Sequence, residues 1–298
     1  MKFVVTGGAG FVGSHLVKLL VNNGHQVTVI DNLHKGKKEN LIEVIDKIEF
    51  LEIDIQNYED MEKNMRGIDG VFHQAALTVV QDSFRMPGEY HNVNVKGTEN
   101  VFKIAHKNNF KVVYASSSSV YGHQKNVPIL ENFVKKPINP YGQTKLDDES
   151  LAKEYSKLGV KIIGLRYFNI FGKGQTLEYA GVITKFLDRI REGKAPIIFG
   201  SGRQIRDFIH VKDVAIANYL AMISDVSFSH VNVGTGSSIS ILELAKMMIK
   251  ISNLDIEPIM AKALEGDIEK SQSDSSLART SFDWKPEEKL EDWLKEIM

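Results

Sequence analysis

The chain has 298 residues, of which 43% are hydrophobic, and its 37 basic side chains nearly balance its 38 acidic ones. Because no broad field of one sign is present, we expect neither nucleic acid nor a membrane surface as a partner, and we look for a small-molecule ligand. The absence of cysteine excludes disulfides, thiolate zinc sites and thiol catalysis, and it favours a reducing, cytoplasmic setting with no metal site.

The start of the chain does not resemble a targeting segment. Met1 and Lys2 lead directly into a strand-like run, and no apolar stretch approaches the roughly 20 residues that cross a bilayer. We therefore expect no signal peptide, membrane anchor or membrane span.

Short β-branched runs alternate with amphipathic helical stretches from Lys2 to about Phe168. Each short run is continuously apolar, as expected when helices cover both faces of a sheet. The alternation predicts an α/β fold with a doubly wound parallel sheet. The expected strands are residues 3–6, 26–31, 48–53, 70–73, 111–115 and 161–167.

The pattern loosens after Asn169 into a glycine-rich passage. We expect a helix at 182–192, a short strand at 197–199, a helix from Val211, a strand at 230–233 and a helix after Ser240. A charged tail follows, with helices that bracket Pro258 and Pro286. The larger, dinucleotide-binding unit is predicted to comprise residues 1–169 plus 208–236. A smaller α/β substrate unit comprises 170–207 plus 237–298.

A glycine-rich turn, GGAGFVG from Gly7 to Gly13, follows the first strand and opens the first helix. Small residues permit a tight turn, let backbone amides approach a pyrophosphate and let the helix pack closely on the strand. The helix N-terminus adds unpaired N–H groups and the positive end of its dipole. The turn therefore predicts a dinucleotide site, although a glycine set by itself also suits a purely structural turn.

Asp31 ends the second strand, 24 positions after the first glycine of the turn. A carboxylate there can accept both ribose hydroxyls of the adenosine half, and it would repel a 2′-phosphate. This favours NAD over NADP, although Lys35, Lys37 and Lys38 lie close enough to leave some NADP tolerance open. Asp54, after the third strand, is a candidate adenine contact.

The segment NPYGQTK, residues 139–145, reads as a helix start, with Asn139 as the cap and Pro140 at the first helical position. Tyr141 and Lys145 are four residues apart, so they project from one face. The ammonium group and the helix N-terminus both favour a phenolate, so a tyrosine with an ordinary pKa of about 10 can act as a base near neutral pH. A packed tyrosine beside a solvated lysine is the alternative.

Four serines, Ser116 to Ser119, follow the fifth expected strand. Ligands of parallel sheets bind at the carboxyl ends of the strands. We therefore expect these hydroxyls to lie beside Tyr141 and Lys145 and to form an acid–base and hydride-transfer site, rather than a merely polar turn.

The chain contains the motifs TGGAGFVGS, SSSSVYG, YGQTK and LRYFNIFG, which together resemble the extended short-chain dehydrogenase/reductase family. Its second half is similar in GSGRQIRDFIHVKDVA, VNVGTG and EGDIEKSQSD. Within that family it is most similar to the nucleotide-sugar branch: UDP-glucose 4-epimerases and relatives acting on UDP-N-acetylhexosamines or UDP-glucuronate. The resemblance implies a Rossmann sheet, a tightly bound NAD that is recycled in place, a UDP-sugar substrate and a homodimer formed through two helices of the larger unit.

The resemblance also implies roles for single residues. Tyr141 is the base, Lys145 anchors the nicotinamide ribose, and Ser117 is the catalytic hydroxyl. The implied cofactor-binding residues are Gly7, Gly10, Phe11, Val12, Gly13, Asp31, Asn32, Asp54, Ile55, Gln74, Ala75, Ala76, Asn94, Ser116, Tyr141, Lys145 and Tyr167.

For the substrate, the resemblance places Asn169 at a phosphate, Val182 and Phe186 near the uracil ring, and Arg206 at the pyrophosphate. The full set of implied substrate-binding residues is Ser117, Ser118, Ser119, Tyr141, Asn169, Val182, Phe186, Arg206, Asp267 and Ser271.

Two positions depart from the family pattern. An arginine often stands three residues before the aspartate of the GD segment, and Leu264 occupies that place here. Pyrophosphate binding must then depend on Arg206, with Lys262 and Arg203 as candidate helpers. Ser271 lies where enzymes restricted to unmodified hexoses carry a bulky tyrosine, so a small residue there permits an N-acetyl group; a plain surface serine is the alternative.

The implied reaction is epimerisation at C4 of a UDP-hexose through a transient 4-keto sugar. Dehydratases of the family carry an Asp-Glu pair after the catalytic hydroxyl, and decarboxylases keep the glutamate. Ser118 and Ser119 stand there instead, which disfavours a lyase. A UDP-glucuronate 4-epimerase and a net reductase stay open. A non-catalytic NAD-binding regulator ranks last, because the Ser, Tyr and Lys residues are all present.

Overall fold

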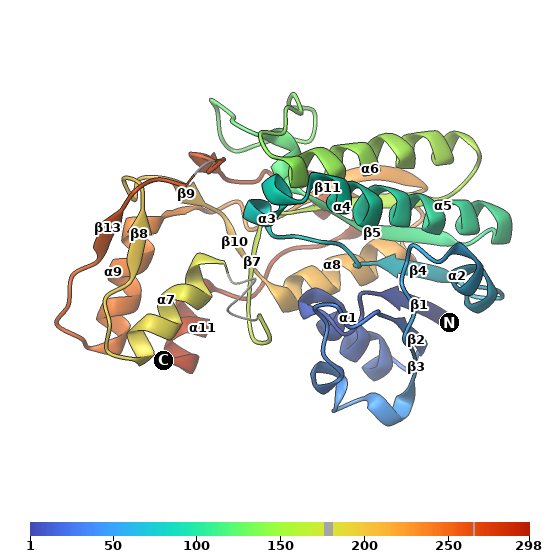
Figure 1. The fold of residues 1–298 in the computed structure, drawn as a ribbon, viewed down its shortest axis with the longest axis horizontal. Coiled ribbons are helices and arrows are strands. Elements are labelled where there is room, and N and C mark those ends of the chain that lie inside the picture. Colours follow the sequence, from blue (N-terminus) through green and yellow to red (C-terminus); the bar gives the residue numbers. More distant parts are fainter. Residues whose placement is uncertain (176–180, 265) are drawn as a thin grey trace.

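A computed structural model describes residues 1–175, 181–264 and 266–298; Glu265, in the EGDIEKSQSD segment, lies outside them. The central element is a parallel sheet with the strand order β11-β6-β5-β4-β1-β2-β3 (Figure 1). Its strands are β1 (Lys2–Thr6), β2 (Gln26–Ile30), β3 (Ile48–Leu51), β4 (Gly70–His73), β5 (Lys111–Ser117), β6 (Ile162–Tyr167) and β11 (Phe228–Val233). The order reverses beside β1, as in doubly wound sheets, so the expected α/β fold class is confirmed.

Each expected strand of this sheet is present, with small shifts at its ends. The shift that matters for the site concerns β5, which continues to Ser117, two residues beyond the expected end. Both Ser116 and Ser117 pair with β6 in the sheet. Because successive side chains of a strand point to opposite faces, these two hydroxyls are directed apart.

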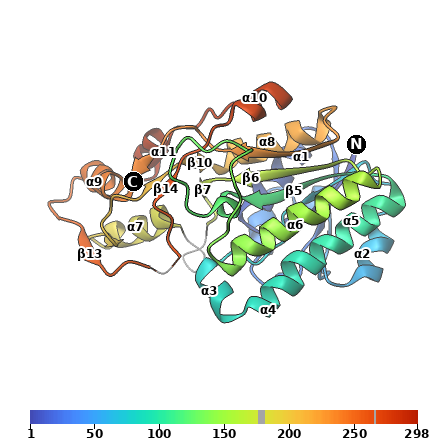
Figure 2. The same ribbon diagram turned by 90° about the horizontal axis from the view of Figure 1, so that it is seen from above.

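Helices cover both faces of the sheet, which explains why its strands are continuously apolar. Phe3 and Val5 belong to one hydrophobic cluster and Val4 to the other. Figure 2 shows α5 and α6 side by side and α1 and α8 across the sheet from them. The first cluster is closed by α1 (Phe11–Asn22) and α8 (Val211–Ile223), and the second by α2 (Tyr58–Asn64), α5 (Gly97–Asn108) and α6 (Pro140–Lys157).

Several short helical segments lack the period that would reveal them in the sequence. They are α3 (Val80–Arg85), α4 (Pro87–Tyr90), the π-helical turn η3 (His91–Lys96) and the 3₁₀ turns η1 (Lys38–Leu41), η2 (Ile45–Lys47) and η4 (Ser118–Tyr121). The segments α4, η3 and α5 follow one another without a break. The wider π turn carries the buried side chain of Asn94.

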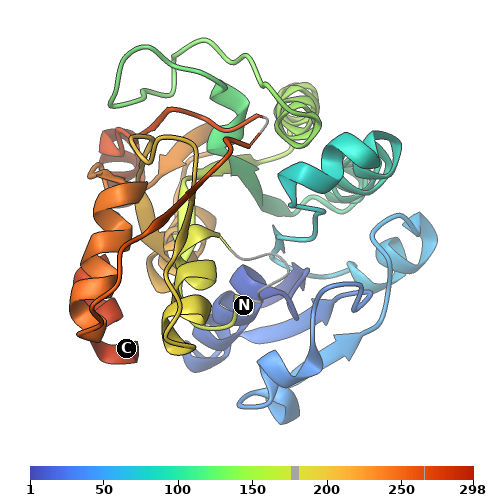
Figure 3. The same cartoon turned by 60° about the vertical axis from the view of Figure 1, so that its left-hand side comes forward.

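A second hydrophobic core lies at the end of the sheet where β6 leads into β7. Figure 3 shows α7 in yellow beside the orange and red end of the chain. The helices of this core are α7 (Val182–Arg191), α9 (Ile241–Ser252) and α11 (Leu290–Ile297). Short strands join them in small sheets: β7 (Asn169–Phe171) with β10 (Phe208–His210), β8 (Ile197–Phe199) with β13 (Ile259–Ala261), and β9 (Ile205–Arg206) with β12 (Ile239–Ser240) and β14 (Lys270–Ser271).

The helices expected from residue 182, from Val211 and after Ser240 are present as α7, α8 and α9. The tail helix α10 (Ser276–Phe282) and the adjacent Trp284 pack into the cluster beneath the large sheet, not into the second core. The division into two units at the expected residues therefore stays a prediction. Within the described ranges, no helix is long and apolar enough to cross a membrane.

His73 ends β4 and is buried. Its Nδ1 and Nε2 atoms lie 2.7 Å and 2.9 Å from the hydroxyl oxygens of Thr6 and Thr98. Burial, and to a lesser degree the charge of Lys145, lowers the pKa of His73 to about 3. The ring thus stays neutral in the folded protein, whereas the unfolded chain protonates it below about pH 6.5.

Replacing His73 with asparagine should flatten the pH dependence of folding. Below about pH 6.5 the unfolded wild-type chain binds a proton that the folded protein does not. The unfolding free energy therefore falls with falling pH, by up to about 1.4 kcal/mol per pH unit from this group. Urea unfolding between about pH 6.5 and pH 5 measures the slope. His106→Asn, at an exposed position of α5, is the control and should keep the wild-type slope. A wild-type slope in His73→Asn would contradict the assignment of this pH dependence to His73.

Candidate active site

The glycine turn packs too closely for side chains at its key positions. Gly7 has a φ of +67°, and a Cβ there would lie 2.7 Å from the backbone nitrogen of Ala75. A Cβ on Gly13 would overlap the carbonyl oxygen of Gly7. The turn after β1, the start of α1 and the loop after β4 therefore meet backbone to backbone.

The N-terminus of α1 opens onto this turn. Gly10 occupies the cap position without a side-chain hydrogen bond, and the first bond within the helix runs from the Ser14 amide to the Gly10 carbonyl oxygen. The amides of Phe11, Val12 and Gly13 precede that first bond. They lie where backbone N–H groups bind a phosphate, so these residues fit the pyrophosphate role expected of them.

Asp31 is held by backbone amides at the end of β2. The Ala9 amide donates to Oδ2 at 3.0 Å, and the Leu33 amide donates to Oδ1 at 2.8 Å. A Cβ on Gly36 would lie 2.8 Å from both carboxylate oxygens, so the following loop folds back onto them. Burial raises the pKa of Asp31, and the two amide bonds oppose that rise. The carboxylate is fixed beside the glycine turn, as a ribose acceptor requires.

Of the residues expected at the adenosine half, Asn32 and Asp54 bind each other, whereas the Ile55 side chain lies elsewhere. The Asn32 amide donates to Asp54 Oδ2 at 2.8 Å, and the backbone amide of Gln56 donates to Asp54 Oδ1 at 2.8 Å. The side chain of Ile55 instead packs into the core, against Gly97. The backbone of Ile55 is therefore the part of this residue that is left for an adenine ring, and the contact stays a prediction.

Gln74 and Tyr167 bind each other and α8 rather than presenting free polar groups. The Tyr167 hydroxyl lies 3.1 Å from Gln74 Oε1 and 2.9 Å from Asn218 Oδ1, and Gln74 Nε2 donates to Asn218 at 3.0 Å. Burial raises the pKa of Tyr167. Ala75 and Ala76, half-buried just after Gln74, line the same loop. The polar groups of Gln74 and Tyr167 are therefore bonded within the protein, and their expected place in the cofactor lining stays a prediction.

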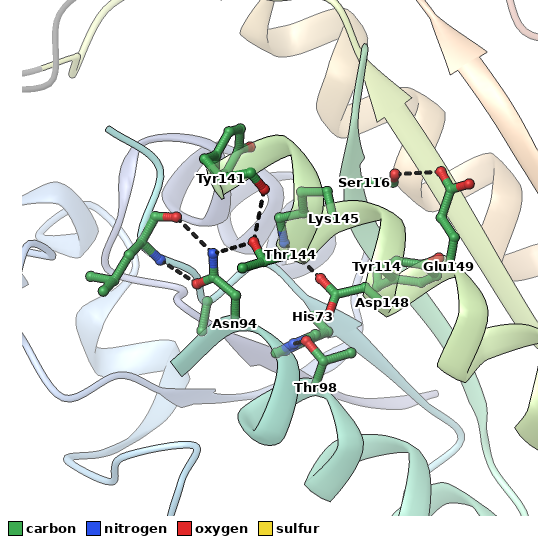
Figure 4. Close-up of polar contacts among 12 residues, drawn as sticks. His73, Asn94, Thr98, Tyr114, Ser116, Tyr141, Thr144, Lys145, Asp148 and Glu149 are labelled. Atoms are coloured by element: carbon green, nitrogen blue, oxygen red, sulfur yellow. Dashed lines mark hydrogen bonds and ion pairs between the residues drawn. The ribbon is translucent and has the colours of Figure 1, made fainter. Parts of the chain in front are cut away.

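Asn94 links the loop after β4 to the start of α6 (Figure 4). Its Oδ1 accepts from the Leu77 amide at 2.8 Å, and its Nδ2 donates to the Leu77 carbonyl oxygen and, at 3.1 Å, to Thr144 Oγ1. The Thr144 hydroxyl donates in turn to the Tyr141 carbonyl oxygen at 2.8 Å. This buried residue thus connects a cofactor-facing loop with the helical turn that carries Tyr141.

The start of α6 forms as the sequence predicts. Asn139 Oδ1 accepts from the Gly142 amide at 2.7 Å and caps the helix. Tyr141 is half-buried one turn before Lys145, whose side chain is buried. The Lys145 ammonium lies 3.2 Å from Asp148 Oδ2. In Figure 4, Lys145 lies between Tyr141 and Asp148.

The serine block divides into two environments. The Ser117 hydroxyl caps η4 and accepts from the Ser119 amide at 3.1 Å, and Ser118 and Ser119 are half-buried on that turn. Ser116 is directed to the other face, where it donates to Glu149 Oε1 at 2.8 Å. Glu149 is also paired with Arg166. The Ser116 hydroxyl is therefore bonded to the interior, and the cofactor contact expected of this residue stays a prediction.

The expected diphosphate residues gather on the small β12-β9-β14 sheet. Arg206 forms an ion pair with Asp267, and burial lowers the pKa of this arginine. Ser271 pairs directly with Arg206 in the parallel β14-β9 register and is buried. Asn169 Nδ2 donates to the Asp207 carbonyl oxygen at 3.0 Å, which ties β7 to the same region.

Asp207 is a supporting residue that the sequence analysis missed. It is fully buried, and its carboxylate accepts from the amides of Thr235, Gly236 and Ser273 at 2.8–3.0 Å. The hydroxyls of Thr235 and Ser273 also donate to it, both at 2.6 Å. It thereby joins β9, the VNVGTG loop and the SQSD segment beside Arg206. The only sequence signal was an acidic residue next to the apolar FIHV run.

Two other expected substrate contacts, Val182 and Phe186, lie in or against the second hydrophobic core. Phe186 is 1% exposed and packs in the second core, and its contact with a uracil ring stays a prediction. Val182 is half-buried against the same core. The candidate helpers Arg203 and Lys262 are exposed, as is Leu264. In the described part of the chain, no cluster of three or more His, Asp or Glu side chains is arranged to hold a metal ion.

Comparisons with known proteins agree with this geometry. The model of the NAD dependent epimerase/dehydratase family matches residues 3–234. A putative UDP-glucose 4-epimerase of Methanocaldococcus jannaschii is 38% identical over 99% of this chain and 96% of its own length. The UDP-N-acetylglucosamine 4-epimerase of Methanobrevibacter ruminantium superposes with a TM-score of 0.94, at 38% identity over 99% of this chain and 96% of that one. The UDP-glucose 4-epimerase of Thermotoga maritima superposes with a TM-score of 0.94, at 35% identity over the same shares.

Replacing Asp207 with asparagine should destabilise the protein by on the order of 3 kcal/mol. The amide group would turn a donor toward backbone N–H groups that now donate to a carboxylate, and buried donors would lose their acceptor. Urea unfolding at neutral pH measures this loss. Asp255→Asn, on an exposed loop, serves as the matched control and should stay within about 0.5 kcal/mol of wild type. Equal stability of the two variants would show that the Asp207 charge is dispensable.

Proposed function

Because this chain belongs to the NAD dependent epimerase/dehydratase family, we propose that it interconverts UDP-sugars that differ in configuration at C4. The observation that supports the proposal is the position of three groups near the carboxyl ends of parallel strands. The uncapped start of α1 and Asp31 follow β1 and β2, Ser117 ends β5, and Tyr141 and Lys145 lie at the start of α6, which packs against β5 and η4. A nucleotide-sugar epimerase needs these three functions together, for cofactor binding, proton transfer and polarisation of a ketone.

The residues of this chain fit NAD. The glycines let the turn, the start of α1 and the loop after β4 pack closely, so that the amides of Phe11, Val12 and Gly13 are available to a pyrophosphate, and Asp31 suits a ribose with a free 2′-hydroxyl. Lys38, one of the lysines that left NADP open, lies 3.5 Å from Glu52 and over the Phe50 ring, which supports NAD. When bound, NAD supplies reversible hydride transfer, so that the sugar is oxidised at C4 and then reduced again with no net redox change.

The chain itself supplies the proton chemistry. Tyr141 removes the proton of the sugar 4-hydroxyl as a general base, and it returns the proton when the ketone is reduced. The ammonium of Lys145 favours the phenolate by its positive charge. The Ser117 hydroxyl donates to the developing ketone while its oxygen accepts the capping bond from the Ser119 amide.

Arg206 and Asn169 are the proposed diphosphate contacts. The Arg206 guanidinium group forms an ion pair with the Asp267 carboxylate. A diphosphate would compete with that carboxylate for the guanidinium group. A substrate held mainly through its diphosphate leaves the sugar free to turn, and a keto sugar must present its other face for the configuration at C4 to change. Loss of the usual second arginine, replaced by exposed Leu264, suits such loose tethering of the sugar.

A lyase is the weaker alternative. A relative from Bacillus cytotoxicus, 35% identical over 82% of this chain, is a UDP-N-acetyl-alpha-D-glucosaminuronate decarboxylase. Here η4 presents Ser118 and Ser119, and the nearby carboxylates of Asp148 and Glu149 are paired with Lys145 and Arg166. These groups leave no carboxylate on η4 for elimination. A 4-keto or decarboxylated product in the assay described next would revive this alternative.

The proposal extends to assembly and location. The long helices α5 and α6 lie side by side on one outer face, and we infer a homodimer through them. The lack of cysteine supports a cytoplasmic location.

Purified enzyme should interconvert UDP-glucose and UDP-galactose, or the corresponding N-acetylhexosamine or hexuronate pair, and Tyr141→Phe should lower kcat by about 10²- to 10⁴-fold. Product ratios measured by NMR give the rates. Tyr155→Phe, on the same helix but packed against Phe102, should keep full activity. No exchange at C4 in any of the three pairs would refute the proposed function.

Ser271→Tyr should select against N-acetylated substrates. Ser271 is buried beside Arg206, so a tyrosine side chain would take space near the bound sugar. We expect kcat/KM for UDP-N-acetylhexosamines to fall at least about tenfold relative to unmodified UDP-hexoses, the range that steric discrimination in a pocket supplies. Ser271→Ala should leave the ratio unchanged. A parallel loss for both substrate classes would show that Ser271 does not control specificity.

A further inference from the structure

Asp148 is a buried carboxylate that the proposed reaction does not use. It lies on α6, one turn after Lys145, and both side chains are buried, with 3% of the lysine side chain and none of the aspartate side chain exposed. Asp148 Oδ2 lies 3.2 Å from the Lys145 ammonium. Its second oxygen, Oδ1, has no hydrogen-bond partner among the described residues. A carboxylate this isolated is retained against a substantial desolvation cost.

The groups around Asp148 do not otherwise balance its charge. His73 on β4 is neutral at physiological pH, and the Thr98 hydroxyl on α5 adds only a weak hydrogen-bonding effect. Tyr114 on β5 has its pKa raised well above the ordinary value by burial. Asp147, on the exposed side of α6, is a second negative charge. Lys145 is therefore the cation that compensates Asp148.

Two tyrosines interact with Tyr141 in the described part of the chain. Burial raises the pKa of Tyr90 on α4 to about 12, and burial also raises the pKa of Tyr167 on β6, so both are uncharged near neutral pH. Lys145, one turn after Tyr141 on α6, is the charged group that Asp148 holds.

We propose that Asp148 is the counter-ion and positioning residue of Lys145, and that its negative charge opposes ionisation of the Tyr141 phenol. The ion pair draws the ammonium toward the interior, on the side away from Tyr141 (Figure 4). Part of the positive field that would stabilise a phenolate is then cancelled by the carboxylate behind it.

This arrangement makes the base respond to pH. Burial raises the pKa of Asp148 to about 7, against the opposing effect of Lys145. As the pH falls through that value, Asp148 becomes neutral and the Lys145 charge acts unopposed on Tyr141. The phenolate is therefore favoured more strongly just where falling pH would otherwise protonate it. The ionised carboxylate therefore disfavours the phenolate chiefly above that pH, and removing its charge should favour the phenolate.

The test is a titration of the Tyr141 phenol in NAD-loaded enzyme. The near-ultraviolet phenolate absorbance is followed against pH, and the same curve measured in the Tyr141→Phe background is subtracted, so that the difference belongs to Tyr141. Asp148→Asn keeps the shape and removes the charge. We expect its Tyr141 midpoint to fall by about one pH unit, the size of shift that a nearby charge produces. Asp147→Asn removes the same charge from the exposed side of α6 and should leave the midpoint unchanged within about 0.3 pH unit.

A purely structural role for Asp148 predicts a loss of stability with no shift of the midpoint, and that result would overturn the proposal. If Asp148→Asn does not fold, Asp148→Ser is titrated in its place with the same expectation. Failure of both to fold, with a stable Asp147→Asn, would also assign Asp148 a structural role and overturn the proposal.

The inference concerns the base named in the proposed function, and the titration needs no turnover. A shifted midpoint without exchange at C4 would support Asp148 and reject the epimerase proposal. Exchange at C4 with an unshifted Tyr141 midpoint would support the epimerase proposal and reject the role of Asp148. Where turnover is present, the acid limb of kcat/KM should move to lower pH in Asp148→Asn by the same interval as the phenol midpoint.

Discussion

The site depends on the parallel register of β1 with both of its neighbours. Thr6 pairs with Ile30 of β2 on one side and with His73 of β4 on the other. The segments that follow these three strands therefore leave the sheet together, at the edge where the strand order reverses. Gly7 makes this possible, because any side chain there would collide with the backbone at Ala75. Displacing the turn would separate the nucleotide-binding groups from the proton-transfer groups.

Buried charged side chains hold in place the segments around β6, α6 and β9. Arg166 binds Glu149 through two 2.7 Å bonds, and this pair holds the end of β6 against α6. Among the described residues, no cation pairs with Asp207, and its carboxylate accepts from backbone amides and hydroxyls. Burying such groups opposes folding unless every bond is made. Their value here is positional, since each links segments that are far apart in the sequence.

Much of the fold was predictable because its main elements are long and have a simple period. Continuous apolar runs gave the strands of the large sheet, and Asn139 with Pro140 gave the start of α6. The expected strand at 197–199 is present as β8, whereas the two-residue strands β9, β12 and β14 were missed, since so few residues carry no periodic signal. Ser116 and Phe186 were assigned from their positions in motifs. In the structure the Ser116 hydroxyl bonds to Glu149 and the Phe186 side chain packs in the second core, and both sets of partners are distant in the chain.

The sequence by itself determined the nature of the chemistry: a glycine turn with Asp31, and a tyrosine and a lysine four residues apart, are local patterns whose geometry follows from a single turn or helix. Only the tertiary structure decided which of these groups are free and which are bound. The interior ion pair of Lys145 with Asp148 and the convergence of distant segments on Asp207 both require burial. Burial is a property of the packed molecule, because removing water is what turns a nearby charge or an unpaired oxygen into a strong constraint.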